Sequence, residues 1–140
     1  MRCIYFFLLF LCLNSFAAST WQEQVKSALP PALQEFIPGK TTLLEIEKSI
    51  GKAQLVKGSK YYWERDRVKY ALELTIKSKM LNSMHFTFTG NKPGLELLQG
   101  KINLKDFKPH QKGRFLKLED KGSELIIDPI GKTIYSVRLP

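Results

Sequence analysis

The sequence predicts an α+β fold in which short N-terminal helices pack on one face of an antiparallel meander sheet. Apolar residues recur every three or four positions between residues 21 and 50, and from residue 60 onward they alternate with polar ones. A Pro-Gly pair, a helix signal and three strand-like segments occur twice, from Pro38 and from Pro93, which allows two helix-plus-three-strand units. At 140 residues the chain has room for one domain, predicted over residues 19–140.

Residues 1–18 have the three parts of a secretory signal peptide: a positive charge, an apolar run and small residues at the end. Arg2 supplies a positive charge, residues 3–13 are almost wholly apolar, and small residues surround Ala17. Cleavage is expected after Ala17, with Ala18 and Ser19 as alternative positions. A membrane anchor is the alternative, but the apolar run is shorter than the roughly 20 residues that span a bilayer. We expect a periplasmic or secreted protein of a Gram-negative bacterium, with no transmembrane segment in the mature chain.

The cysteines and the net charge narrow the chemistry further. Cys3 and Cys12 both lie inside the predicted signal peptide, so disulfides, a thiolate nucleophile and a cysteine-based metal site are not expected. The formal net charge is +9, and loss of Arg2 lowers it by one. In an exported protein an anionic partner would be a lipid, an envelope polymer or an acidic protein, and not nucleic acid. Alternatively, the charge serves only solubility.

Two short helical pieces are expected between residues 21 and 36, at the start of a helical region that extends to about residue 50. Pro30 and Pro31 interrupt the pattern because proline lacks the backbone donor and crowds the preceding turn. We expect this face to pack against the rest of the domain. The apolar residues spaced by three or four are Trp21, Val25, Leu29, Leu33 and Phe36.

A further helix is expected from Leu43 to Ile50. Thr42 and Glu45 have the spacing of a capping box, in which each side chain bonds to the other residue's backbone amide. Gly51 supplies the left-handed residue that commonly ends a helix. The preceding Gly-Lys-Thr does not form a phosphate-binding loop, because that motif requires a glycine where this chain has Gln34.

Three strands are expected in a first meander, residues 60–89, and three in a second, residues 114–139. Short polar connections between the strand-like segments favour antiparallel hairpins. The segments are 61–63, 68–76 and 80–89 in the first meander and 114–119, 124–127 and 133–139 in the second.

Residues in the first part of this pattern resemble those of a known family. The residues Pro38-Gly39-Lys40-Thr41-Thr42, Glu45-Ile46, Ile50-Gly51, Tyr61-Tyr62-Trp63 and Leu72-Glu73-Leu74 together resemble the SmpA/OmlA (BamE-like) domain of small bacterial envelope proteins. The resemblance covers about residues 36–88. It implies a fold akin to the β-lactamase-inhibitor protein and a non-enzymatic role in binding other proteins or the envelope.

No residue pattern predicts an enzyme, a metal site or a cofactor. His85 lies in a strand-like segment and His110 in a loop, and neither stands at a motif spacing from a serine, cysteine or carboxylate. The carboxylates do not cluster with imidazoles in a ligand pattern. We therefore expect no catalytic residues and no bound cofactor.

An aromatic-basic hairpin is the leading candidate for a binding surface, because Tyr, Trp and Arg most often anchor interfaces. On a strand Tyr61 and Trp63 face one way and Tyr62 the other, so at least part of this set is expected in the core. A second, basic cluster either touches an anionic surface or is a solvated loop. The hairpin set is Tyr61, Tyr62, Trp63, Arg65, Arg67 and Lys69, and the basic cluster is Lys105, Lys108, Lys112 and Arg114.

Taken together, these features predict a non-enzymatic exported binding protein that contributes to envelope assembly or maintenance through contacts with a protein partner. One alternative is an inhibitor of a secreted or periplasmic enzyme. A second alternative is a binder of anionic lipid or envelope polysaccharide.

Overall fold

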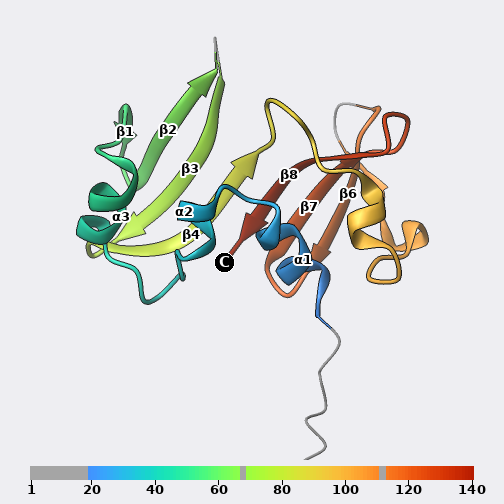
Figure 1. Cartoon of the computed structure of the whole chain (residues 1–140), viewed down its shortest axis with the longest axis horizontal. Coiled ribbons are helices and arrows are strands. Elements are labelled where there is room, and N and C mark those ends of the chain that lie inside the picture. Colours follow the sequence, from blue (N-terminus) through green and yellow to red (C-terminus); the bar gives the residue numbers. More distant parts are fainter. Residues whose placement is uncertain (1–18, 67–68, 111–112) are drawn as a thin grey trace, which may run out of the picture.

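The computed structural model describes residues 19–66, 69–110 and 113–140 (Figure 1). The predicted signal peptide lies outside these residues. The helices are α1 (Trp21–Ser27), α2 (Pro31–Gln34) and α3 (Leu43–Ile50), with 3₁₀ turns η1 (Leu95–Leu98) and η2 (Leu104–Asp106). The strands are β1 (Leu55–Lys57), β2 (Lys60–Asp66), β3 (Lys69–Lys77), β4 (Met80–Thr87), β5 (Lys108–Pro109), β6 (Leu116–Asp120), β7 (Ser123–Asp128) and β8 (Thr133–Leu139). Within the described residues, no helix has the length and apolar composition that a membrane span requires.

All eight strands belong to one antiparallel sheet with the order β1-β2-β3-β4-β8-β7-β6-β5. The α+β prediction, with its allowance for two helix-plus-three-strand units, is therefore wrong: the fold is a single sheet-rich layer with three short α-helices. The two predicted meanders merge because β4 pairs with β8, with Met84 opposite Leu139 and Phe86 opposite Val137. Each meander also gains a short edge strand, β1 or β5, that the sequence pattern did not indicate.

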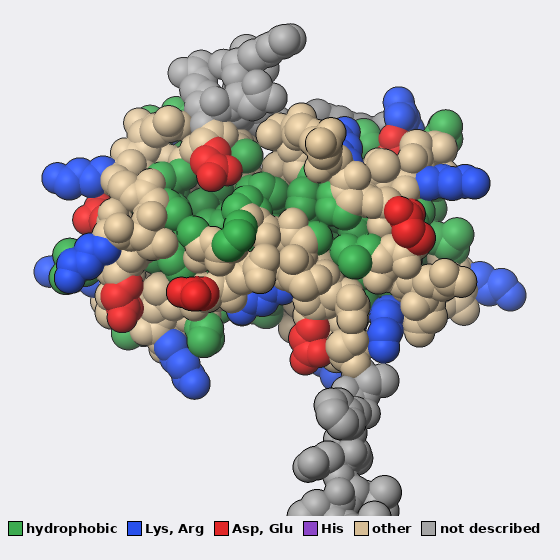
Figure 2. Space-filling model, viewed as in Figure 1, with side chains coloured by type: hydrophobic (Ala, Val, Ile, Leu, Met, Phe, Trp, Pro, Cys, Tyr) green, Lys and Arg blue, Asp and Glu red, His purple; other side chains and the backbone are tan. Residues whose placement is uncertain are grey.

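The described helices cover one face of this sheet, which we call the inner face; the opposite face is the outer face. Ile46 of α3, Val25 of α1 and Leu33 of α2 join one core cluster with strand residues of the inner face. In Figure 1 α1 and α2 are drawn in front of the middle of the sheet, and α3 lies beside β1 and β2. Figure 2 shows hydrophobic side chains across the middle of this helix-covered side and charged side chains around its rim. Fully burying an aliphatic side chain of this size contributes about 1.5–3 kcal/mol, so these contacts hold short helices that would not persist alone.

The predicted helix from Leu43 to Ile50 is confirmed as α3. Thr42 and Glu45 form the capping box, with the Thr42 amide donating to the Glu45 carboxylate at 2.7 Å. This hydrogen bond is the first cause of a lowered pKa at Glu45. Gly51 ends the helix with φ of 81°, a conformation that favours glycine.

The two helical pieces expected before it are confirmed as α1 and α2, separated at Pro30. The helix α1 begins with a second capping box, formed by Thr20 and Glu23, which the sequence reading did not identify. Both caps satisfy backbone amides that the first turn of a helix leaves free.

Candidate functional site

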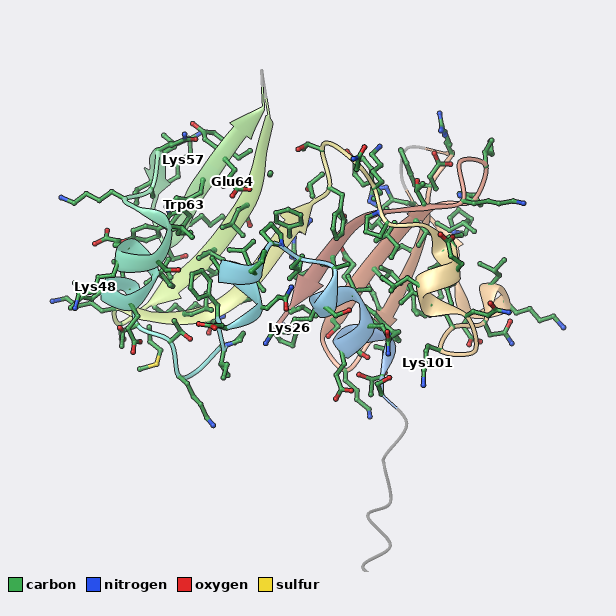
Figure 3. All side chains as sticks on the ribbon, viewed as in Figure 1. Lys26, Lys48, Lys57, Trp63, Glu64 and Lys101 are labelled. Carbon is green, nitrogen blue, oxygen red and sulfur yellow. The ribbon has the colours of Figure 1, made fainter. Side chains whose placement is uncertain are left out.

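The predicted aromatic-basic hairpin is divided between the two faces of the sheet. Trp63 is 3% exposed and belongs to the core cluster, and its Nε1 donates to the Gly51 carbonyl oxygen at 2.9 Å. Tyr61 packs on the same cluster and stacks with Trp63, their ring centroids 6.2 Å apart. Trp63 therefore ties β2 to the end of α3, beside which it lies in Figure 3. These two aromatics pack with the core and help to hold the fold.

Tyr62 lies on the outer face, where it pairs with Glu73 and its ring centroid is 5.3 Å from that of Tyr70. Burial is the first cause of a raised pKa at Tyr62, and the negative charge of Glu73 is the second. Of the basic members, Arg65 and Lys69 lie in strands, but their side chains lie outside what the structure describes. Arg67 lies outside the described residues altogether. Only Tyr62 of the predicted set is thus placed on an open surface.

The predicted basic cluster is spread over several elements. Lys105 is exposed on η2 and Lys108 on β5, while Lys112 lies outside the described residues. Arg114 instead turns towards the end of β7, where its guanidinium forms an ion pair with Asp128. The four residues therefore do not act as one patch within the part of the chain that is described.

Polar side chains form a continuous row across the outer face, which we call the polar row. Strand register places each member directly opposite the next, so the row crosses six strands. Such directly opposed pairs are close enough to interact. From β2 to β6 the polar row consists of Tyr62, Glu73, His85, Arg138, Glu124 and Glu119.

Lysines at both ends of the polar row neutralise its carboxylates. Lys60 lies 3.3 Å from Glu73, and Lys117 lies 2.7 Å from Glu119 and 3.9 Å from Glu124. The hydrogen bond between Lys117 and Glu119 is the first cause of a raised pKa at the lysine and of a lowered pKa at the glutamate. These ion pairs hold the carboxylates at both ends of the polar row in place.

Beside the polar row, the middle of the outer face carries small residues. Thr87 pairs with Ser136, which pairs with Ile126, and all three are at most 5% exposed. Ile126 does not belong to the core cluster under the helices. Because these residues lie on the side opposite the helices, neighbouring side chains of the outer face must cover them.

Two cations and two aromatic rings form a second cluster, which we call the cation–aromatic array: Lys92, Arg114, Phe115 and Tyr135. The Phe115 and Tyr135 ring centroids are 4.7 Å apart. The Lys92 Nζ lies 5.4 Å from the Tyr135 centroid, and the Arg114 Cζ lies 5.8 Å from the Phe115 centroid. Both distances are within the range of a cation–π interaction. The array brings together residues that no local sequence motif connects.

Asp128 holds the Arg114 side chain of the array in position. Its carboxylate accepts a hydrogen bond from Arg114 Nε at 3.3 Å, forms an ion pair with Nη2, and accepts from the amides of Ile130 and Gly131 at 3.1 Å each. The Arg114 hydrogen bond is the first cause, followed by the Gly131 amide, of an Asp128 pKa lowered to about 2. A carboxylate at the end of β7 and an arginine before β6 are 14 residues apart, and only the β6–β7 hairpin brings them together.

The two histidines lie in different parts of the fold. His85 is a member of the polar row, between Glu73 and Arg138, and the His110 amide donates to the Phe115 carbonyl oxygen at 2.9 Å. Among the described residues, no three His, Cys, Asp or Glu side chains gather closely enough to hold a metal ion.

Comparison with known proteins supports the fold alone. No protein-family model and no curated protein sequence matches the chain. Among solved structures, the chain is similar to the DUF4309 family protein YjgB from Bacillus subtilis, with a TM-score of 0.53 and 16% sequence identity over 84% of this chain and 90% of that one. An identity this low establishes a shared architecture and no function. The resemblance to the SmpA/OmlA family stays a prediction.

Proposed function

We propose that this protein is a non-enzymatic exported binding protein that engages a protein partner through the outer face of its sheet. The observation that carries this proposal is the one-sided covering of the sheet: the described helices all contribute to the inner core. The outer face carries the polar row and the cation–aromatic array instead. A role in envelope assembly or maintenance rests on the predicted signal peptide and the family resemblance.

The dimensions of the outer face suit a standard protein interface. Eight strands spaced by about 4.8 Å give a sheet roughly 34 Å wide. A standard interface buries about 800 Å² on each partner, which corresponds to a patch about 30 Å across. One sheet face is thus large enough to accept a folded domain or an extended segment.

The residue types on this face also favour recognition. Two aromatic pairs lie apart in the sheet: Tyr62 contacts Tyr70 between β2 and β3, and Phe115 contacts Tyr135 near β6 and β8. Tyrosine and arginine are over-represented among residues whose truncation weakens interfaces strongly. Because the strands fix these side chains, little conformational freedom would be lost on binding.

A photo-crosslinking experiment tests this proposal. A benzophenone amino acid replaces Ser83, which pairs with Thr75 on the outer face, and in a control protein it replaces exposed Ser49 on α3. After irradiation in envelope extract we expect a discrete adduct from position 83 and none from position 49. Equal adducts from both positions, or no adduct from position 83, would contradict the proposal.

A matched pair of charge reversals checks the same face without a label. Arg138→Glu changes an exposed member of the polar row, and Lys48→Glu changes an exposed residue of α3 (Figure 3). Both variants change the net charge by the same amount, so a general electrostatic effect would weaken capture equally. We expect only Arg138→Glu to abolish the crosslink from position 83.

The crosslinked protein also decides between the two protein-binding alternatives. If it is a hydrolase, its activity is measured with and without a molar excess of this protein. Stoichiometric loss of activity would identify an inhibitor, and unchanged activity would identify a scaffold or assembly contact.

A further inference from the structure

We infer that the cation–aromatic array is the anchor for an acidic segment of the protein partner. This inference rests on the proposed function, because it names the chemistry that one part of the outer face recognises. The array consists of two exposed cations separated by two touching, half-buried rings. Such a surface offers charge to carboxylates and apolar area to the chain between them.

Arg114 is held in position before any partner arrives. Its Nε and Nη2 atoms face Asp128, whose side chain is only 7% exposed, whereas the side chain of Arg114 is 56% exposed. A guanidinium has five N–H donors, so the Nη1 edge remains for an external acceptor. A planar carboxylate matches that edge better than a single point charge does. Fixing the arginine in advance lowers the entropy lost on binding.

Asp128 is itself fixed, which makes the arginine position rigid. The amides of Ile130 and Gly131 both donate to its Oδ1 atom at 3.1 Å. The carboxylate therefore cannot turn away from the β7–β8 turn without losing two hydrogen bonds. If Arg114 rotated away from Asp128, this carboxylate would lose its ion pair and keep only its hydrogen bonds to the two backbone amides.

Lys92 provides the second positive charge, on the far side of the rings. It comes from the segment between β4 and η1, and its Nζ lies over Tyr135, not beside a carboxylate among the described ion pairs. Phe115 and Tyr135 occupy the space between the cations. Two acidic side chains of one extended segment could each contact one of these cations.

An acidic protein segment fits this surface better than a membrane does. Charge-driven membrane binding typically uses clusters of four to eight basic residues. The array itself holds two described cations, Lys92 and Arg114, and Asp128 neutralises one of them. Ile130, which is 77% exposed in the β7–β8 turn, is the feature that a membrane would use instead. Its substitution separates the two possibilities.

The experiment measures binding of fluorescent poly-L-glutamate to the full chain and its variants. Arg114→Gln and Lys92→Gln each remove one cation of the array, and Lys108→Gln removes an exposed cation on β5 as the matched control. We expect Kd to rise about tenfold for Arg114→Gln and several-fold for Lys92→Gln, with less than a twofold change for Lys108→Gln. Lys92→Gln leaves the Asp128 contacts intact, so it tests the array even if Arg114→Gln lowers the stability.

Two results would overturn the inference. Equal weakening by all three substitutions would show that only net charge matters. Binding to vesicles of 30% phosphatidylglycerol that is lost in Ile130→Ser, without binding to poly-L-glutamate, would assign the surface to lipid. The crosslink from position 83 distinguishes failure of this inference from failure of the proposed function. If the crosslink forms but the array variants bind polyglutamate as tightly as the wild type, only the inference is refuted. If no crosslink forms but polyglutamate binding depends on the array, only the proposed function is refuted.

Discussion

The two halves of the sheet have mirrored strand order but are held together differently. In the half formed by β1 to β4, α3 is stabilised by its own capping box, and Trp63 bonds to the residue that ends this helix. In the half formed by β5 to β8, two 3₁₀ turns replace such a helix, and the Arg114–Asp128 pair fastens the strand ends. The first half is fastened by a helix and a tryptophan hydrogen bond to its end, and the second by an ion pair between strand ends.

The strongest test of this comparison targets the seam where the halves meet. Phe86 of β4 is opposite Val137 of β8 and is 6% exposed. Truncation of a buried phenylalanine costs about 3–5 kcal/mol, so Phe86→Ala is expected to lower the unfolding free energy by that amount. Urea titration followed by circular dichroism measures it, and Phe86→Leu, which keeps most of the apolar volume, should cost clearly less.

The same titrations show whether the halves unfold together. Trp21 lies on α1, which packs against η1, and Trp63 lies on β2, so the two tryptophans report on different halves. Single-tryptophan proteins made with Trp21→Phe or Trp63→Phe should give coincident transitions, as expected for one cooperative sheet. Separated transitions would show that the halves are independent units.

Loss of a helix cap should have a moderate effect in either half. Thr42→Ala removes the side chain that accepts from the Glu45 amide, and Thr20→Ala removes its equivalent at Glu23. Each is expected to cost about 1 kcal/mol, because the amide of Glu45 or Glu23 loses its side-chain acceptor. Chemical denaturation measures both, and Thr→Ser at each position should restore most of the stability. A cost near zero for both Ala variants would mean that neither cap contributes.

Substitutions in the β3–β4 turn and the β6–β7 turn should change the stability of the protein in opposite directions. In the β3–β4 turn Ser78 and Lys79 have φ of 51° and 60°, and in the β6–β7 turn Lys121 and Gly122 have φ of 50° and 81°. Lys79→Gly is expected to stabilise the protein and Gly122→Ala to destabilise it, each by up to about 1 kcal/mol. A Cβ at position 122 would meet only ordinary contacts from Pro140, so the cost comes from the backbone. Thermal denaturation measures both shifts.

The last prediction concerns how the contribution of Asp128 to stability changes at acidic pH. The Asp128 pKa is lowered from 3.8 to about 2 in the folded protein. Its ionised form therefore contributes stability that is complete above about pH 4 and is lost as pH falls towards 2. Asp128→Asn should show a shallower loss of stability over that interval. Identical slopes for the wild type and the variant would show that Arg114 and Asp128 do not interact in solution.

Local signals predicted α3 correctly because its cap, its apolar spacing and its terminating glycine are all read within ten residues of each other. The merging of the meanders could not be read in this way. Pairing of β4 with β8 joins residues about 50 apart, and alternation alone does not say which strand is a neighbour. The edge strands were missed because Leu55–Lys57 is too short to show alternation and β5 contains Pro109.

Only the part of the candidate site that depends on short-range spacing could be predicted from the sequence. Strand alternation separated Tyr62 from Tyr61 and Trp63, so the division of the aromatic hairpin followed from spacing. The polar row needs the register of five strand pairs, and the cation–aromatic array needs three chain segments to converge. The sequence contains these residues but no short-range pattern that links them.

The position of β8 has a consequence for the order in which the chain can fold. It is the last strand in the sequence, yet it lies between β4 and β7 and pairs with both. A chain that emerges from the ribosome or a translocation channel N-terminus first can form each hairpin early, but it cannot join them until residue 139 has emerged. Until then both β4 and β7 present unpaired edges, which are open to aggregation or to a chaperone.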